Sequence, residues 1–365
     1  MRHFIIGLLA AFAGIGQAAL AQPADTITGA GSSAAAPVYR VWSREYARET
    51  GISLAYDAVG SSAGVARIKQ RTVDFGASDV APPEQDLARD GLVALPTVIT
   101  GAVPVINLPR VGNDQLRLTG GVLARIFLGE ITAWNAPEIR ELNPSVALPA
   151  LPIKVVVRAD GSGTTYNFSD YLSKVSPEWK SRMGVKSGFQ WPAAFLPAKG
   201  SDGVARTTKE TVGAIGYVDY NYVLDYALAA VQVRNASGEF VRASVQSFRE
   251  AVLNSAWHRN GDFRGTLTDA AGKGAWPITM GTFVLFHKTA ANPEATLRAL
   301  HFVTWGYLHG DDLARTAKFV PLPDLVQAKA YRLITSIADG KGQLIGWRVL
   351  ADRKYLSGNA PVPKL

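Results

Sequence analysis

Apolar positions along the chain follow two alternating patterns. Short apolar runs bounded by Gly, Ser or Pro are typical of buried strands, and such runs lie at residues 26–28, 52–59, 73–77, 95–108, 153–158, 213–220 and 278–287. Segments whose apolar residues recur every three or four positions are typical of helices, and they lie at residues 37–50, 65–68, 168–175, 293–308 and 323–338. Strands that alternate with helices predict an α/β fold with a mostly parallel sheet.

Three Gly/Ser loops each connect a predicted strand to a predicted helix. They lie at Gly29–Ser33, Gly60–Gly64 and Asp160–Thr165. Backbone N–H groups at a helix start lack intrahelical acceptors, and the helix dipole adds positive charge there. Any one of these loops is explained by Ser or Thr acting as a helix N-cap. Three of them in one chain favour convergence on a single oxyanion.

The first residues have the pattern of a targeting segment. Arg2 gives a basic start, residues 4–13 are apolar and uncharged, and Ala19-Leu20-Ala21 is a small-x-small cleavage site. We therefore expect residues 1–21 to be a cleaved signal peptide and the protein to be periplasmic. The chain has no cysteine, which excludes disulfides, cysteine–metal sites and a lipid anchor on cysteine.

Length and charge narrow the class of protein. A chain of 365 residues suggests two domains of ordinary size, or one large domain, after the signal peptide. The formal net charge is +8 and the pI is about 9.6, a balance that suits nucleic acid, anionic lipid or a small anion. Basic residues are spread along the chain without an aromatic–basic recognition motif, so no nucleic-acid partner is expected.

Two of the loops also match enzyme motifs. Residues 29–34 satisfy the loose G-x-G-x-x-A dinucleotide pattern, with Asp57 placed for a ribose hydroxyl. Residues 60–64 satisfy G-x-S-x-G, in which Ser62 would be a hydrolase nucleophile. Gly/Ala-rich turns are common, and a nucleophile elbow normally follows more of its sheet. The histidines lack metal-ligand spacing, so we assign no catalytic residue, metal or cofactor.

Two charged residues at the ends of predicted strands carry the most specific chemistry. Arg158 offers a planar guanidinium that binds two oxygens of a tetrahedral anion. Asp79 repels an oxyanion unless that anion carries a proton for the carboxylate to accept. Phosphate keeps a proton near neutral pH and sulfate does not, so the pair favours phosphate. The alternative is that Asp79 forms an ion pair with a lysine or caps a helix.

At these residues the chain resembles the periplasmic phosphate-binding proteins of Pst-type ABC transporters. The matching stretches are residues 28–31, 59–62, 72–79, 158–164, 213–218 and 275–279. The family implies a two-lobe clamshell, each lobe a mostly parallel sheet flanked by helices, with phosphate in the cleft between the lobes. The implied division is lobe 1 at residues 22–99 plus 284–345, lobe 2 at 100–283 and a C-terminal extension at 346–365.

The resemblance also implies the roles of individual residues. The implied phosphate-binding residues are Ser33, Ala34, Ser61, Asp79, Arg158, Ser162, Gly163 and Thr164. Asp79 would be the proton acceptor, and Asp160 would orient Arg158. A monomer would deliver inorganic phosphate to an inner-membrane ABC permease and ATPase complex.

One departure from the family lies in the first loop. The family often has Thr-Phe-Pro where this chain has Ser33-Ala34-Ala35. Serine keeps the hydroxyl and Ala34 keeps its N–H, but the lost ring leaves the cleft less shielded at that edge. An exported phosphoester hydrolase with the same phosphate cradle, or a receptor for another tetrahedral oxyanion, stays open as an alternative.

Overall fold

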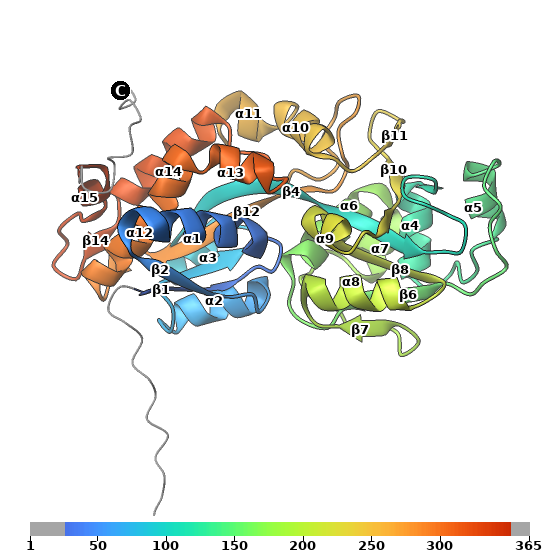
Figure 1. The fold of residues 1–365 in the computed structure, drawn as a ribbon, viewed down its shortest axis with the longest axis horizontal. Coiled ribbons are helices and arrows are strands. Elements are labelled where there is room, and N and C mark those ends of the chain that lie inside the picture. Colours follow the sequence, from blue (N-terminus) through green and yellow to red (C-terminus); the bar gives the residue numbers. More distant parts are fainter. Residues whose placement is uncertain (1–25, 352–365) are drawn as a thin grey trace, which may run out of the picture.

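The computed structural model describes residues 26–351 and is built on one mixed β-sheet with helices on its faces (Figure 1). The strand order is β2-β1-β3-β12-β4-β8-β6-β7, and β9 pairs with β4. These strands are β1 (Thr26–Gly31), β2 (Ser53–Asp57), β3 (Phe75–Ser78), β4 (Leu92–Asn107), β6 (Lys154–Arg158), β7 (Leu196–Ala198), β8 (Ala214–Asp219), β9 (Ala229–Ala230) and β12 (Thr279–His287). The predicted signal peptide, residues 1–21, lies outside the described residues.

Two long strands, β4 and β12, join the halves of the sheet. β1 pairs in parallel with β2 and β3 at one end, and β6 pairs in parallel with β7 and β8 at the other. Between these groups, β12 is antiparallel to β3 and β4, and β4 is antiparallel to β8. The parallel strand pairs expected within each lobe are therefore present. The antiparallel strand pairs at the centre make the sheet as a whole mixed.

The two positions at which we expect the chain to pass from one lobe to the other lie inside the two long strands. Residues 99/100 lie in β4, and residues 283/284 lie in β12. The register of this strand pair is irregular between Gly281 and Phe283. An irregular register bends a strand pair locally, and this irregularity lies next to the expected change between lobes.

In lobe 1, helix α1 (Ala36–Thr50) follows the first Gly/Ser loop and packs on α12 (Pro293–His309). Trp42 is buried, and its indole N–H donates to the backbone carbonyl of Gly310 at 3.0 Å. The buried apolar surface of the indole ring adds to this hydrogen bond, because burial stabilises by about 25 cal/mol for each Å² of apolar surface. Because α1 is held in this way, the loop that precedes it is held as well.

In lobe 2, aromatic rings anchor helix α6 (Gly163–Val175). Phe168 stacks on Tyr217 of β8 with ring centroids 4.3 Å apart. Its ring also lies edge-on to Phe127 of α4 (Gly120–Phe127), with centroids 4.8 Å apart. These contacts fix the position of the α6 N-terminus, which follows the third Gly/Ser loop.

The remaining elements surround this frame. The helices are α2 (Ser61–Lys69), α3 (Glu84–Arg89), α5 (Pro137–Leu142), α7 (Pro177–Arg182), α8 (Gly200–Glu210), α9 (Tyr220–Asp225), α10 (Val245–Leu253), α11 (Ala256–Asn260), α13 (Asp311–Thr316), α14 (Asp324–Thr335) and α15 (Gly346–Ala351). The short strands are β5 (Arg117–Leu118), β10 (Gln232–Arg234), β11 (Phe240–Val241), β13 (Thr289–Ala290) and β14 (Ala338–Asp339).

The expected C-terminal extension begins with a packed helix. Helix α15 lies against α12 and α14 and buries Val349. Residues 352–365 of the extension lie outside the described part of the chain. None of the helices between residues 26 and 351 has the length and apolar character needed to span a membrane.

Candidate anion-binding site

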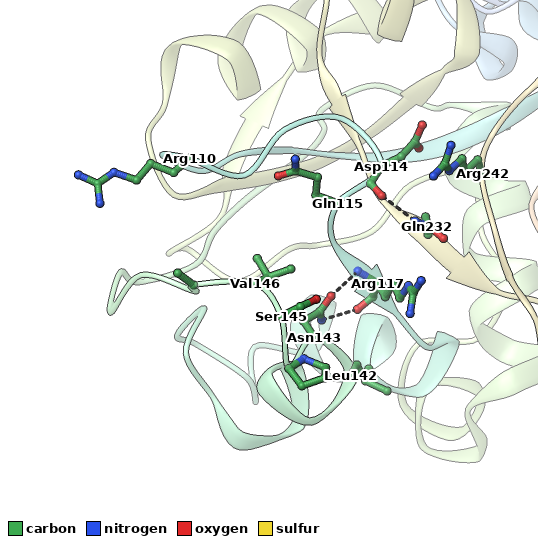
Figure 2. Close-up of a pocket in the computed structure, with 12 residues that line it drawn as sticks. Arg110, Asp114, Gln115, Arg117, Leu142, Asn143, Ser145, Val146, Gln232 and Arg242 are labelled. Carbon is green, nitrogen blue, oxygen red and sulfur yellow. Dashed lines mark hydrogen bonds between the residues drawn. The ribbon is translucent and has the colours of Figure 1, made fainter.

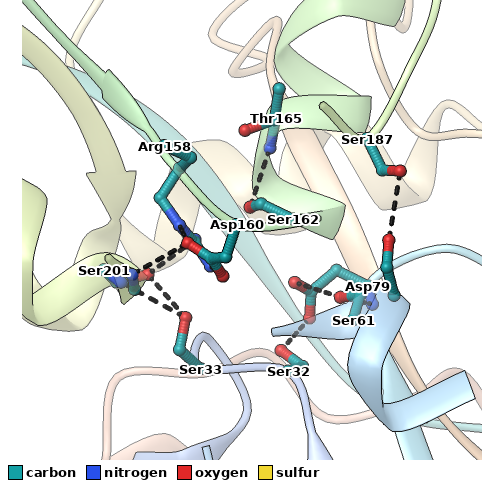
Figure 3. A network of polar contacts seen from close by, with 12 residues as sticks. Ser32, Ser33, Ser61, Asp79, Arg158, Asp160, Ser162, Thr165, Ser187 and Ser201 are labelled. Atoms are coloured by element: carbon teal, nitrogen blue, oxygen red, sulfur yellow. Dashed lines mark hydrogen bonds and ion pairs between the residues drawn. The ribbon is translucent and has the colours of Figure 1, made fainter. Parts of the chain in front are cut away.

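The three Gly/Ser loops and the end of β3 meet between the two lobes (Figure 3). The backbone N–H of Ser62 donates to the carbonyl of Gly161 at 3.1 Å. The side-chain amide of Asn167 donates to the backbone carbonyl of Asp79 at 2.8 Å. Each of these bonds joins a lobe 1 loop to the α6 end of lobe 2. The structure is therefore closed at this place, and the convergence that the sequence predicts is present.

Asp79 lies at the centre of the cluster, directly after β3. Its carboxylate is buried and accepts a hydrogen bond from the Ser32 hydroxyl, and the Ser61 hydroxyl lies 3.4 Å from its other oxygen. Burial raises the pKa of Asp79 to about 6, although the Ser32 bond and the charge of Arg158 act in the opposite direction. A buried carboxyl that titrates near neutral pH can accept or hold a proton at this point.

Arg158 faces the same cluster from the end of β6. Its guanidinium is buried, and Nε donates to Asp160 at 2.8 Å while Nη2 donates to the other Asp160 oxygen. Asp160 also accepts from the backbone N–H of Gly200 at 2.9 Å. Burial acts to raise the pKa of Asp160, but its bonds to Arg158 and Gly200 outweigh that effect and the pKa is lowered. One edge of the Arg158 fork is thus held by Asp160, as the resemblance implies.

The N-terminus of α6 supplies hydroxyl and backbone groups to the cluster. Ser162 is the N-cap, and its hydroxyl oxygen accepts from the N–H of Thr165 at 3.1 Å. A serine that accepts in this way keeps its own hydrogen for another acceptor. The buried Thr164 hydroxyl has no hydrogen-bond partner among the described atoms. A buried unpaired hydroxyl costs free energy, and an anion would supply the missing acceptor.

Gly163 allows the two lobes to approach closely at this helix start. A Cβ at this position would lie 2.6 Å from both the Asp79 Cβ and the Ser61 hydroxyl oxygen. Real side chains do not tolerate contacts this short, so any larger residue must shift the lobe 1 atoms that it meets. The absence of a side chain at Gly163 therefore has a packing reason in the closed form.

The first loop contributes Ser33 and Ala34, both buried. The Ser33 hydroxyl lies 2.9 Å from the hydroxyl of Ser201 in α8. The backbone carbonyl of Ser33 accepts from the Tyr222 hydroxyl at 3.1 Å. The first loop of lobe 1 is thereby tied to α8 and α9 of lobe 2.

The structure brings the predicted site residues into one cluster, with Asp160 on Arg158. Sequence reasoning missed Ser32, Asn167, Ser201 and Tyr222. Ser201 had a readable signal, because Gly200-Ser201 follows β7 and opens α8 in the same strand–Gly/Ser–helix pattern as the three loops. Asn167 lies in α6 and Tyr222 in α9, outside the helical segments that the sequence predicts, and neither gave a local signal.

The candidate residues of the two enzyme motifs have partners that do not fit an enzyme site. The Ser62 side chain is exposed, and its hydroxyl lies 3.2 Å from Ser187 rather than beside a histidine. Asp57, the candidate ribose ligand, forms an ion pair with Arg67 at 2.6 Å. Neither arrangement resembles the nucleophile–base pair of a hydrolase or an acidic residue held open for a ribose.

A separate polar cavity of about 480 Å³ lies in lobe 2 (Figure 2). Arg117 and Arg242 line it together with Asp114, and Asn143 exchanges two 2.8 Å hydrogen bonds with the backbone of Arg117. No residue of the Gly/Ser loops lines this cavity. The cavity is therefore distinct from the cluster between the lobes.

Comparison with known proteins places the chain in a family. Residues 16–306 match the model of the PBP superfamily domain. The chain is 41% identical over 300 residues to the phosphate-binding protein PstS of Haemophilus influenzae, covering 82% of this chain and 90% of that protein. It is 42% identical over 307 residues to PstS of Xylella fastidiosa, covering 84% of each chain. The chain belongs to the PstS family of phosphate-binding proteins.

Solved structures agree with the fold of this PstS-family chain. A phosphate-binding protein from Stenotrophomonas maltophilia superposes with a TM-score of 0.64 at 20% identity, covering 89% of this chain and 97% of that one. This likeness supports the two-lobe α/β architecture. The relatives are named as binding proteins, which supports the expectation of a binding protein rather than an enzyme.

Proposed function

We propose that this protein captures inorganic phosphate between its two lobes and delivers it to an ABC importer. One observation carries the proposal: the buried Asp79 carboxylate lies beside the Ser32 and Ser61 hydroxyls of lobe 1 and within the electrostatic reach of Arg158 in lobe 2. The names of its relatives support phosphate as the ligand. No bond of the ligand is broken and no cofactor takes part.

The donors divide between the lobes. From lobe 1, the Ser33 and Ser61 hydroxyls and the Ala34 N–H would bind phosphate oxygens. From lobe 2, the Arg158 N–H groups that Asp160 does not hold and the α6 N-terminus at residues 162–164 would bind the others, with Asp160 holding Arg158 in place. The unpaired Thr164 hydroxyl supports an acceptor at this point. Hydrogen bonds from charged donors to an anion are the strong ones.

Asp79 gives the site its preference for a protonated anion. Its carboxylate can accept a hydrogen bond from a phosphate that carries a proton, whereas a sulfate dianion would leave two negative groups facing each other without a proton. Burial makes such an unpaired contact costly. The site should therefore bind phosphate and reject sulfate.

Phosphate binding and lobe closure would be one event. Because the donors come from both lobes, the anion stabilises the closed form over the open form. We further propose lobe 1 at residues 22–99 plus 284–345 and lobe 2 at 100–283, with the hinge in β4 and β12. The protein would act as a periplasmic monomer after removal of residues 1–21, and its partner would be an inner-membrane permease and ATPase complex.

Calorimetric titration of the phosphate-stripped protein from Gln22 onward tests this function. We expect one phosphate per chain with a micromolar or tighter Kd, and no sulfate binding. Arg158→Ala should weaken phosphate binding by about ten-fold or more, since a charged hydrogen bond contributes roughly 1.5–3 kcal/mol. Arg140→Ala, an exposed arginine on α5, is the matched control. Sulfate binding, or equal effects of both substitutions, would contradict the proposal.

A further inference from the structure

Ser201 lies where the two lobes meet but outside the three Gly/Ser loops. It is 1% exposed in the first turn of α8. Its hydroxyl oxygen lies 2.9 Å from the Ser33 hydroxyl oxygen and 3.4 Å from Nη1 of Arg158. Its backbone N–H also donates to the Ser33 hydroxyl oxygen at 3.4 Å. Ser201 therefore connects a predicted ligand of lobe 1 to a predicted ligand of lobe 2 (Figure 3).

The direction of two of these three hydrogen bonds follows from what each group can donate, while either hydroxyl can donate in the third. A guanidinium and a backbone N–H only donate, so Arg158 occupies one lone pair of the Ser201 hydroxyl and the Ser201 N–H occupies one lone pair of the Ser33 hydroxyl. Each hydroxyl has a single hydrogen. If Ser33 gives its hydrogen to the anion, then only Ser201 is left to donate between the two hydroxyls.

Ser33 then has both of its lone pairs filled by Ser201. One is filled by the N–H and the other by the O–H of the same residue. Under that condition the Ser33 hydrogen has no acceptor in this pair and must point elsewhere. The bonds form a chain in one direction, from Arg158 through Ser201 to Ser33, and hydrogen bonds in such a chain strengthen one another.

The start of α8 is fixed relative to Arg158. Asp160 holds Nε and Nη2 of the guanidinium and also accepts from the N–H of Gly200, the residue before Ser201. The guanidinium and the helix start are thus both attached to one carboxylate. The Ser201 hydroxyl is placed by this arrangement before any ligand arrives.

The neighbouring Ser32 uses its hydroxyl hydrogen within the protein. Its hydroxyl donates to Asp79, and its oxygen accepts from the N–H of Ala35 at 3.1 Å. The single Ser32 hydrogen is used on the protein. Of these two adjacent serines, only Ser33 can have a hydrogen left for an anion, and it has one when Ser201 is the donor between the two hydroxyls.

We propose that Ser201 is a positioning residue for phosphate, which accepts from Arg158, donates to Ser33 and thereby directs the Ser33 hydroxyl hydrogen to the anion. The inference rests on the proposed function. It adds helix α8 to the three Gly/Ser loops from which the sequence predicts the site.

A double-mutant cycle tests it, with phosphate affinities of the mature protein measured by calorimetry. Ser201→Ala should weaken phosphate binding by about ten-fold, the effect of one hydrogen bond to an anion. In a Ser33→Ala background the same change should cost less than about two-fold, because Ser201 acts through the Ser33 hydroxyl. Ser201→Thr keeps the hydroxyl and should retain near-normal affinity. Thr207→Ala, which removes a hydroxyl from the same helix, should change it by less than about two-fold.

The outcomes separate this inference from the proposed function. If the wild-type protein fails to bind phosphate, both are overturned. If it binds normally but Ser201→Ala has no effect, or its effect is additive with Ser33→Ala, only the role of Ser201 is overturned. Should Ser201→Ala fold poorly, Ser201→Cys keeps a similar volume with a weaker donor and should show the same non-additive loss.

Discussion

At the scale of single residues, Asp79 sets the chemistry of the site. Arg158 and the hydroxyls around it would attract any oxyanion. They therefore explain the affinity for an anion but not the preference for one anion over another. The Asp79 carboxylate is the group that distinguishes a protonated anion from one without a proton. Because this carboxylate is buried beside Ser32 and Ser61, an anion without a proton would bind there only at a high cost in free energy.

Asp79→Asn should narrow the gap between phosphate and sulfate. An amide of the same shape can donate an N–H to a sulfate oxygen, which a carboxylate cannot do. We expect the ratio of the two dissociation constants, measured by calorimetry at neutral pH, to fall by about ten-fold or more, the range of one hydrogen bond to a charged group. An unchanged ratio would remove Asp79 as the selectivity element.

The raised pKa of Asp79 should also appear in the stability of the phosphate-free protein. A carboxyl with a pKa of about 6 when folded, against 3.8, binds its proton more tightly in the folded protein. The resulting stabilisation is present at low pH and is lost as pH rises through 6. Between pH 5 and 8 the wild type should therefore lose on the order of 1 kcal/mol that Asp79→Asn does not lose.

Urea unfolding of both proteins across this pH range measures the difference. Asp219, whose pKa burial raises to about 7 against bonds from Thr100 and Asn221, is present in both proteins. The Asp79 charge is the smallest of the causes that act on the Asp219 pKa, so most of the Asp219 contribution cancels. Parallel pH profiles for the two proteins would show that Asp79 does not titrate in this range.

At the scale of elements, the start of α6 must lie almost against lobe 1. Gly163→Ala places a Cβ where Ser61 and Asp79 lie in the closed form. The glycine has no unusual φ, so the open form should tolerate alanine. We expect phosphate affinity to fall by about ten-fold or more with little change in the melting temperature of the phosphate-free protein.

Gly188→Ala is the matched control for this substitution, because a Cβ at Gly188 meets no atom within 4 Å. Its phosphate affinity should equal that of the wild type. If the two alanine variants bind phosphate equally well, close approach at the α6 N-terminus is not needed for binding.

Most strands of the large sheet and five of the helices could be predicted from the sequence, since each of them depends on a local pattern. The apolar runs mark the long strands, and the strand–Gly/Ser–helix pattern marks the loops that meet at the site. The antiparallel pairing of β4 with β12 could not be predicted in the same way, because it joins residues far apart in the chain and no local pattern specifies the partner. Tyr222 and Asn167 were missed for a related reason: their contacts exist only once the lobes are placed together.

At the scale of the whole molecule, the cross-lobe contacts describe a closed form. The bonds from Asn167 to Asp79 and from Tyr222 to Ser33 hold only when the lobes are together. Phosphate would add further bonds on both sides and shift the population toward this form.

Small-angle X-ray scattering should detect that shift. We expect the radius of gyration of the phosphate-stripped protein to decrease when phosphate is added to saturation, as the lobes rotate about β4 and β12. The Gly163→Ala variant should show a smaller decrease at its own saturation. Identical profiles with and without bound phosphate would contradict closure driven by the ligand.

The most direct measurement is a crystal structure of the protein grown with phosphate. The account predicts one tetrahedral anion between the lobes, within about 3 Å of Asp79, Arg158 and the Thr164 hydroxyl. Phosphate found only in the separate cavity lined by Arg117 and Arg242, or a cleft without phosphate at saturating concentration, would contradict it.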